Sequence, residues 1–311
     1  MLNKWAPAPV AKPAVVARAV ANAPAKADKQ KVAILRRKEL GNNCKFIADA
    51  YDDGMEIVTP DTLNGKLIKL DWIVRWGTTS PIGPVNDKAN VINKASAITE
   101  TSSKGGFRLL AHKQGLTPRT WANLDALGNE KEPPEAVIIR TMHHERSENI
   151  ALCRTFEEAN KAIAATKGQG YYISEYIKKD EEYRVFVAQG RAFMVFRKRP
   201  KDKNAVSWGC VEEGAMEYVN WSQWPLAVVE NAIKAFNLSK LDFGAADIIV
   251  KDGKAYFLEI NTAPEVWPYY GERFADVIKY IINVSRDRIK TVFTKDWKNY
   301  IHPAISEKAI V

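Results

Sequence analysis

The chain has 311 residues, of which 46% are hydrophobic and 27% are charged, so it holds enough apolar material for two or three packed units and is too apolar for a disordered protein. No run of about 18 uninterrupted apolar residues occurs, which excludes a membrane-spanning helix, and three dispersed cysteines fit a reducing cytoplasm better than a disulfide framework. The formal net charge is +9, but residues 1–31 hold six basic residues against one acidic residue, so little excess charge is left for the rest.

Residues 1–30 are rich in Ala, Pro, Val and Lys, and their prolines argue against a long helix. Their aliphatic side chains are too small to build a core. We therefore expect a flexible basic arm, and we expect any contact with nucleic acid to run through this arm only. A mitochondrial presequence is the competing interpretation, because the segment is basic and nearly free of acids, although serines are few and prolines recur.

Residues 31–117 alternate strand-like and helix-like segments, which is the pattern of a small α/β domain. Short apolar runs predict strands, and longer amphipathic stretches, the last of which stops at Gly115, predict helices. The predicted strands are 31–35, 56–59 and 70–75, and the predicted helices are 43–53, 86–101 and 105–114.

Residues 118–178 are predicted to form a second, smaller unit. Its helix begins at a capping box, in which Thr155 is the N-cap and Glu158 lies three residues further on. Strands lie on either side of this helix in the sequence, and a polar stretch connects the first two strands. The predicted strands are 136–140, 150–153 and 171–177, and the polar connection is 141–149.

Residues 179–311 are predicted to form a larger unit built on two hairpins. The strands of the first hairpin meet at Gln189 and Gly190 and carry basic residues at their ends. An amphipathic helix separates the two hairpins, and a basic helix followed by a polar tail ends the chain. The predicted strands are 183–188, 191–197, 244–250 and 256–261, and the helices are 226–236 and one that starts near 286.

The second hairpin carries Asp247 on its first strand and Glu259 and Asn261 on one face of its second strand. A loop of three residues, 252–254, would place Asp247 opposite Glu259, whereas a two-residue Asp-Gly turn would place Leu258 there. We expect the three-residue loop. Three oxygen donors at the end of a buried hairpin suit a hard cation such as Mg²⁺. The alternative interpretation is a solvated strand face that happens to carry two charges.

The order of these parts resembles the ATP-grasp superfamily over roughly residues 85–285. The similarity rests on a lysine before a helix and a Gly-x-x-Pro turn, an apolar strand that ends in a basic residue, a Ser-Glu-Tyr-Ile strand, an Arg-bearing strand, and Asp followed by Glu-x-Asn. It is most similar to carboxylate-amine ligases of the ribosomal-protein glutamate-ligase type. The resemblance implies an α/β (α+β) ATP-grasp fold with a small subdomain at 118–178, a C-terminal subdomain at 179–311 and a preceding α/β domain at 31–117.

The resemblance also implies a role for each matching residue. Asp247, Glu259 and Asn261 would bind Mg²⁺, or Mn²⁺ in its place, between the β and γ phosphates of ATP. Arg184 and Arg197 match catalytic positions that face the phosphates or the acyl-phosphate intermediate, where fixed cations offset the charge of two reacting anions. The residues that match nucleotide-binding positions are Lys104, Arg140, Glu175, Tyr176, Ile177 and Lys198.

Two features depart from the family's pattern. Arg140 stands where the family usually has Lys, which keeps the charge on a longer and flatter side chain. The connection 141–149 is poor in Gly, although the family usually closes a Gly-rich backbone over the phosphates. The side chains of His144, Arg146 or Ser147 could make these contacts instead.

The implied function is that of a cytoplasmic, Mg²⁺-dependent carboxylate-amine ligase that uses ATP. A substrate carboxylate takes the γ phosphate to give an acyl phosphate, and an amine then displaces phosphate to form an amide-type bond. The substrates could be amino acids, peptides or a protein terminus, and no motif indicates the oligomeric state. Two alternatives compete with this function: a relative that binds nucleotide or a partner without turnover, which the Gly-poor connection favours, and a nucleic-acid-associated protein that uses the basic arm.

Overall fold

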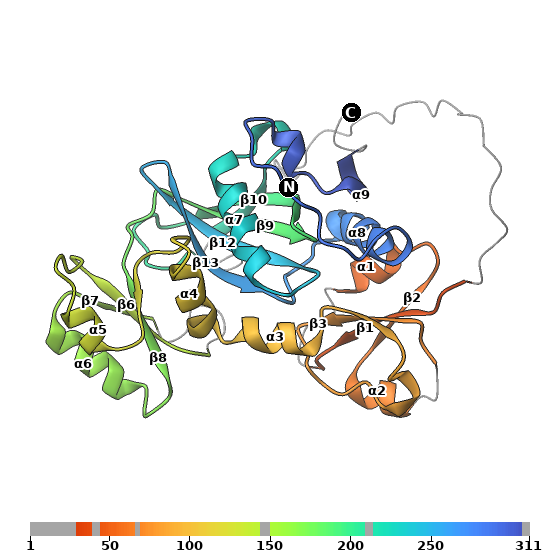
Figure 1. Ribbon diagram of the computed structural model, residues 1–311, viewed down its shortest axis with the longest axis horizontal. Coiled ribbons are helices and arrows are strands. Elements are labelled where there is room, and N and C mark those ends of the chain that lie inside the picture. The colour runs from red at the N-terminus through yellow and green to blue at the C-terminus, as the bar shows by residue number, and fades with distance from the viewer. Residues whose placement is uncertain (1–28, 39–43, 66–68, 144–149, 209–213, 307–311) are drawn as a thin grey trace, which may run out of the picture.

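The computed structural model describes residues 29–38, 44–65, 69–143, 150–208 and 214–306. They fold into three units, each built on its own sheet (Figure 1). No helix in these ranges is long and apolar enough to cross a membrane. The residues of interest that lie outside the described ranges are nearly all of the predicted basic arm, His144, Arg146, Ser147 and Cys210.

The N-terminal unit consists of a parallel sheet and short helices, namely β1 (Val32–Arg36), α1 (Lys45–Asp49), β2 (Met55–Val58), α2 (Pro60–Gly65), β3 (Trp72–Trp76), η2 (Pro84–Asn86) and β4 (Asn90–Ile92). The strand order is β2-β1-β3-β4. Parallel strands are covered on both faces, and β1 and β3 are accordingly buried almost throughout. The predicted α/β rhythm of this region is therefore confirmed.

The predicted helix 86–101 is wrong in its first half, because η2 and β4 precede α3 (Ala95–Ser102). Asn93 interrupts the segment with a φ of 60°, a value that is uncommon outside glycine. Its side-chain amide bonds the backbone of Asp242 and Phe243 about 150 residues further along the chain. A distant contact thus overrides the local helical pattern.

The small unit follows α4 (Lys104–His112) and comprises β5 (Thr120–Trp121), α5 (Leu124–Gly128), β6 (Val137–Thr141), β7 (Ala151–Cys153), α6 (Phe156–Ala165) and β8 (Tyr171–Glu175). Its antiparallel sheet has the order β5-β8-β6-β7. The predicted capping box is confirmed, since the Thr155 hydroxyl accepts from the Glu158 N–H and the Glu158 carboxylate accepts from the Thr155 N–H. Ile139 and Ile173 belong to a hydrophobic core that is made only of residues of this unit.

The large unit comprises β9 (Glu181–Ala188), β10 (Arg191–Pro200), β11 (Gly214–Tyr218), η3 (Trp221–Gln223), α7 (Leu226–Leu238), β12 (Phe243–Lys251), β13 (Lys254–Asn261), η4 (Pro268–Tyr270), α8 (Gly271–Asn283), η5 (Trp297–Tyr300) and α9 (Pro303–Ser306). Its antiparallel sheet has the order β11-β10-β9-β12-β13, which makes β13 an edge strand. The basic helix predicted near residue 286 is wrong, because no helix occurs between α8 and η5. The backbone there bonds the large sheet instead, through Gln189.

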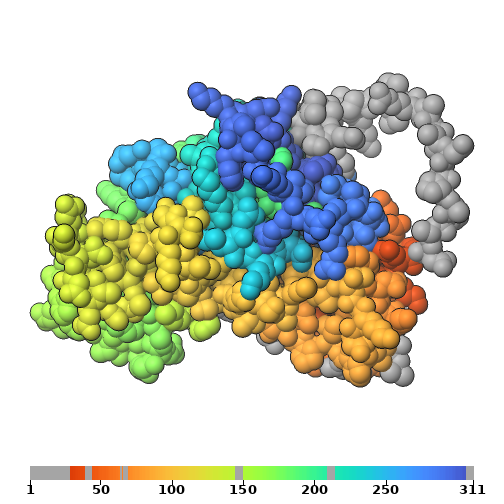
Figure 2. Space-filling model, in the orientation of Figure 1, coloured from red at the N-terminus to blue at the C-terminus, as the bar shows by residue number. Residues whose placement is uncertain are grey.

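The N-terminal and large units share one hydrophobic core, in which the rings of Trp76 and Phe274 lie 5.6 Å apart. At Gly271, a Cβ atom would lie 2.2 Å from the carbonyl oxygen of Phe46, so α8 approaches α1 more closely than any other residue type would permit. The small unit lies at the other end of the molecule (Figure 2). We therefore treat the N-terminal and large units as one body and the small unit as a separate lobe.

Candidate active site

The second hairpin of the large unit turns in two residues rather than the predicted three. Lys251 pairs with Lys254, and the turn residues Asp252 and Gly253 have φ values of 50° and 74°, as a type I′ turn requires. Asp247 nevertheless lies opposite Glu259, as predicted, because β13 carries a β-bulge at this point: Ile248 pairs with Phe257 and Asp247 with Glu259. Leu258 is the extra residue of the bulge.

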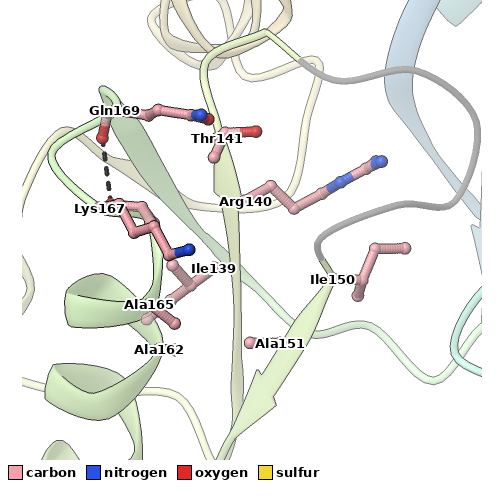
Figure 3. A pocket seen from close by; sticks show the side chains of 10 residues that line it. Ile139, Arg140, Thr141, Ile150, Ala151, Ala162, Ala165, Lys167 and Gln169 are labelled. Atoms are coloured by element: carbon pink, nitrogen blue, oxygen red, sulfur yellow. Dashed lines mark hydrogen bonds between the residues drawn. The ribbon is translucent and has the colours of Figure 1, made fainter.

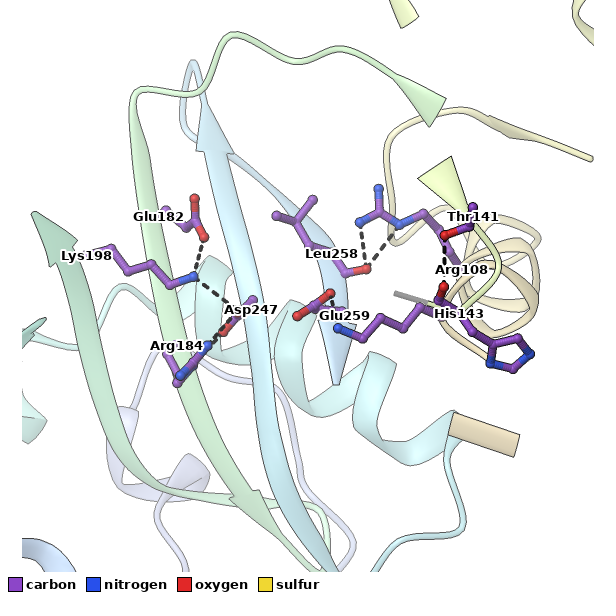
Figure 4. A network of polar contacts seen from close by, with 10 residues as sticks. Arg108, Thr141, His143, Glu182, Arg184, Lys198, Asp247, Leu258 and Glu259 are labelled. Carbon is purple, nitrogen blue, oxygen red and sulfur yellow. Dashed lines mark hydrogen bonds and ion pairs between the residues drawn. The ribbon is translucent and has the colours of Figure 1, made fainter. Parts of the chain in front are cut away.

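Asp247 is buried in the middle of the large sheet, and two neighbouring strands bring cations to it (Figure 4). Arg184 on β9 binds both carboxylate oxygens, with distances of 2.8 Å from Nε to Oδ1 and 2.9 Å from Nη2 to Oδ2. Lys198 on β10 lies 3.0 Å from Oδ2. Burial alone would raise the pKa of Asp247, but these two cations outweigh it and hold that pKa well below its usual range.

Glu182 and Lys179 extend this network, although the sequence analysis did not single them out. The Glu182 carboxylate bonds Lys198 and lies 3.0 Å from Lys179, and all of these groups are nearly inaccessible to solvent. The ammonium group of Lys179 also lies 4.9 Å from the ring centre of Trp208. Strand alternation could have identified Glu182, because it lies two residues before Arg184 and therefore shares its face.

Glu259 and Asn261 lie on the edge strand next to this network. The Glu259 carboxylate is 2.9 Å from the ammonium group of Lys104, which is the first residue of α4. Asn261 has a buried amide nitrogen, Nδ2, with no hydrogen-bond partner among the described residues. A buried amide that the protein leaves unsatisfied is the kind of group expected to contact a ligand.

The small lobe presents Arg140, Tyr172 and Ser174 toward α4 and the hairpin, while Ile139 and Ile173 point into its own core. Burial lowers the pKa of Arg140, whereas nearby Tyr172 and Glu259 act in the opposite direction. A guanidinium remains charged at neutral pH, so Arg140 adds a cation to the side of the site opposite Asp247.

Two predicted residues point elsewhere. The Glu175 carboxylate is held by Arg119, whose Nε and Nη2 each lie 3.1 Å from one of its oxygens, on the face of β8 that Ser174 does not share. Arg197 pairs with Glu181 and the Tyr183 hydroxyl, so it lies on the face of β10 opposite Lys198. The structure therefore does not bring Arg197 or the Glu175 carboxylate together with Asp247 and Glu259.

Tyr176 and Ile177 follow β8 directly, in the connection that leads to β9 and the large unit. The Tyr176 N–H donates to the carbonyl oxygen of Ala136. These residues therefore form the hinge between the two lobes, and the family resemblance implies that they bind the nucleotide.

The small lobe contains a cavity of about 340 Å³ between β6, β7 and the C-terminal end of α6 (Figure 3). Its charged lining residues are Arg140 and Lys167, and Arg140 extends away from α6 on the other side of β6. The cavity reaches the ends of both strands that flank 144–149. It lies beside the candidate site rather than within it, since neither Asp247 nor Glu259 lines it.

The assembled site suits a complex of a divalent cation with a polyanion. Asp247, Glu259 and Asn261 offer the hard oxygen donors that Mg²⁺ prefers. The cationic side chains gathered around the carboxylates of Glu182, Asp247 and Glu259 are Lys104, Arg108, Arg140, Lys179, Arg184 and Lys198. This excess of positive charge favours a ligand with several negative charges, such as a nucleoside triphosphate.

Comparison with known proteins bears on the family and the fold of the chain. A family model described as a RimK-like ATP-grasp domain matches residues 127–283, which is half of the chain. A D-alanine–D-alanine ligase from Fusobacterium nucleatum subsp. nucleatum is 26% identical over 212 residues, which cover 63% of this chain and 70% of that protein.

Solved structures share the fold at low sequence identity. D-alanine–D-alanine ligase from Bacillus anthracis in complex with ATP superimposes with a TM-score of 0.58 at 14% identity, over 82% of this chain and 98% of that chain. The ATP-grasp ligase PsnB in complex with a minimal precursor, Mg and ADP gives a TM-score of 0.56 at 11% identity, over 83% of this chain and 99% of that chain. The predicted ATP-grasp fold is therefore confirmed.

Proposed function

Because this chain belongs to the RimK-like ATP-grasp family, we propose that it is an Mg²⁺-dependent ligase that activates a carboxylate as an acyl phosphate and joins it to an amine. The relatives that the chain matches are ligases, so an enzyme of the ligase type is supported. The finer proposal rests on one observation above all. Asp247 lies opposite Glu259 on a hairpin, and Asn261 lies two residues after Glu259 on the same strand. Lys104, Arg184 and Lys198 pair with the two carboxylates, and Arg140 of the small lobe interacts electrostatically with Glu259.

In the proposed reaction, a carboxylate oxygen attacks the γ phosphorus of ATP, the bond to the bridging oxygen breaks, and ADP leaves. An amine nitrogen then attacks the carbonyl carbon of the acyl phosphate, phosphate departs with the bonding electron pair, and the nitrogen loses a proton. Mg²⁺ held by Asp247, Glu259 and Asn261 would offset the phosphate charge. Arg184 and Lys198 would bind phosphate oxygens, for which the planar fork of Arg is suited.

The ion pairs of Asp247 with Arg184 and Lys198 also bear on the order in which the metal ion and ATP bind. Both of its oxygens already accept bonds from Arg184 and Lys198, so a metal ion arriving alone would meet an occupied carboxylate and add charge beside two cations. The phosphates of ATP would draw these cations away from Asp247 and leave its oxygens to the metal. We therefore expect the metal to bind together with the nucleotide and only weakly without it.

The substrates that we propose are an amino acid or peptide carboxylate and an amine of the same class. The relatives support this choice, because one is a D-alanine–D-alanine ligase and the ligase PsnB was also solved with a precursor peptide. Closure of the small lobe, which has its own core, would exclude water and so protect the acyl phosphate from hydrolysis.

The direct test is Mg²⁺-dependent release of ADP, screened over amino acids and short peptides. We expect release that depends on both a carboxylate and an amine substrate, and we expect Asp247→Asn and Glu259→Gln to abolish it. The matched control is Glu217→Gln, which removes a strand carboxylate that pairs with Arg199 at the exposed edge of the same sheet. This variant should retain wild-type activity.

Full ADP release by Glu259→Gln would contradict the metal site. Tight nucleotide binding without release of ADP across the whole screen would instead favour the binding-module alternative. The Gly-poor connection 141–149, where the sequence departs from the family's pattern, is the feature that motivates this second arm of the test.

A further inference from the structure

Arg108 makes an unusual set of contacts for a residue outside the predicted site. It lies on α4, one turn after Lys104, and its side chain is almost fully buried. Its Nε and Nη2 atoms both donate to the carbonyl oxygen of Leu258, at 3.0 Å and 2.7 Å. Its Nη1 atom lies 3.2 Å from the Ser174 hydroxyl, and the guanidinium lies 5.6 Å from the ring centre of Tyr172. One side chain therefore contacts both lobes.

The carbonyl group that Arg108 binds belongs to the bulge of β13. A bulge leaves the backbone groups of the extra residue outside the ladder, and buried backbone groups need other partners. The α4 region supplies them on both sides of the bulge. Arg108 bonds the oxygen of Leu258, and the carbonyl oxygen of Leu116, just after α4, accepts from the Phe257 N–H at 2.7 Å.

The bulge decides which side chain lies opposite Asp247. With the two-residue turn of this hairpin and no bulge, the register would put Leu258 opposite Asp247 and Glu259 opposite Ala246. Because strand side chains alternate, a shift of one residue sends each of them to the other face of the sheet. Glu259 would then point away from Asp247.

We propose that Arg108 is a positioning residue, which holds the bulge at Leu258 and thereby keeps Glu259 in register with Asp247 for metal binding. The inference rests on the proposed metal–nucleotide site. Arg108 acts through Glu259 and not on the nucleotide. Its contact with Ser174 connects the same guanidinium to β8, the last strand of the small lobe before the hinge.

The test measures the affinity of Mn²⁺ by calorimetry in the presence of AMPPNP, so that no turnover is needed. Arg108→Met removes every hydrogen bond of the guanidinium and should weaken Mn²⁺ binding about 10-fold to 100-fold, the range typical for losing a partner that orients a metal ligand. Arg108→Lys keeps the charge but loses the fork that grips one carbonyl oxygen with two N–H groups. It should give a smaller but measurable loss of affinity.

Two control variants separate positioning from general stability. Arg75→Met removes another buried arginine that donates to two carbonyl oxygens, those of Thr78 and Ser80, in the N-terminal unit. It should lower the melting temperature about as much as Arg108→Met while leaving the Mn²⁺ affinity unchanged. Ser174→Ala removes only the contact with the small lobe, and it should likewise leave the Mn²⁺ affinity within about threefold of wild type.

Chemical rescue provides a readout that a purely structural role would not give. Ethylguanidinium added at millimolar concentration to Arg108→Ala should restore part of the Mn²⁺ affinity, because it can occupy the space next to the Leu258 carbonyl. The same addition should not affect Arg75→Ala.

Unchanged Mn²⁺ affinity in Arg108→Met would overturn the proposal. If Arg108→Met does not fold, Arg108→Lys decides in the same way. Equal losses in Arg108→Met and Arg75→Met would also overturn it, since both effects would then reflect stability alone. A failure of the proposed function itself gives a different result, in which wild-type protein does not bind Mn²⁺ even with AMPPNP.

Discussion

The centre and the edge of the large sheet hold their carboxylates by different means. At the centre, Asp247 lies in an unbroken ladder with β9, directly opposite Arg184, and its cationic partners come from β9 and from the next strand, β10. At the edge, Glu259 depends on a bulge, and the partners of that strand come from α4. The central carboxylate is almost inaccessible, whereas 19% of the Glu259 side chain is exposed.

This difference separates stability from ligand binding. Removing a partner from a buried ion network leaves uncompensated charges, so the centre should respond to mutation by unfolding. The edge carries a single partly exposed ion pair, which contributes little to folding. Loss of the Glu259 carboxylate should therefore change metal affinity far more than stability, and three measurements of the free energy of unfolding test the contrast.

The largest effect is expected from Asp247→Asn, which leaves Arg184 and Lys198 buried without their shared carboxylate. The free energy of unfolding should fall by about 3 to 5 kcal/mol, as is typical when one partner of a buried ion pair is lost. Urea denaturation without nucleotide measures it. A loss below about 1 kcal/mol would show that the centre is no more dependent on its ion network than the edge.

An intermediate loss of stability is expected on lowering the pH. It comes from the buried His302 and has to be distinguished from any contribution of the site carboxylates. His302 is fully buried against Gln189, and burial, assisted by nearby Arg191, lowers its pKa to about 3. In the unfolded chain His302 takes up a proton with a pKa near 6.5, whereas in the folded chain it stays neutral down to a much lower pH. The contribution of neutral His302 to stability is therefore fully present above about pH 7 and is lost as the pH falls. The loss should reach about 2 kcal/mol at about pH 5.

His302→Gln should remove this pH dependence between about pH 5 and 7, and denaturation curves at several pH values measure it. Asp247 contributes nothing in that window, because its depressed pKa moves its titration to lower pH. An equal acid sensitivity in wild type and His302→Gln would place the titrating group elsewhere.

The smallest change in stability is expected from Glu259→Gln. The ion pair with Lys104 is partly exposed, so its loss should lower the free energy of unfolding by no more than about 1 kcal/mol. The affinity for Mn²⁺ with AMPPNP should nevertheless fall by more than the roughly 10- to 100-fold expected for an outer partner of a metal ligand. A loss of stability as large as that of Asp247→Asn would remove the distinction between centre and edge.

The same contrast explains what the sequence could and could not predict. Alternation within β13 was enough to place Glu259 and Asn261 on one face, and the order of the parts was enough for the fold. The bulge was not predictable, because Leu258 carries no local signal for it and its partner Arg108 lies 150 residues away in sequence. The pairing of Asp247 with Glu259 was therefore predicted correctly, but from a three-residue loop that does not occur; the bulge at Leu258 produces the pairing instead.

Arg197, in the basic run of β10, lies away from the residues with which the resemblance grouped it. Its charge and position matched a catalytic residue. Strand alternation, however, puts its side chain on the other face of β10 from that of Lys198, and there it pairs with Glu181. Period-two counting along β9 from Arg184 would have found Glu182. Contacts between residues far apart in sequence, such as that of Arg119 with Glu175 within the small lobe, depend on the tertiary fold and have no such signal.

The most direct test of the metal–nucleotide site is a Mn²⁺ titration of wild-type protein and Glu259→Gln, each with and without AMPPNP. We expect AMPPNP to raise the Mn²⁺ affinity of wild type by at least roughly 10-fold, because phosphates release Asp247 from its cations, and we expect Mn²⁺ to raise the AMPPNP affinity by the same factor. In Glu259→Gln this coupling should disappear. Equal Mn²⁺ affinity with and without nucleotide, or coupling that survives in Glu259→Gln, would contradict the site.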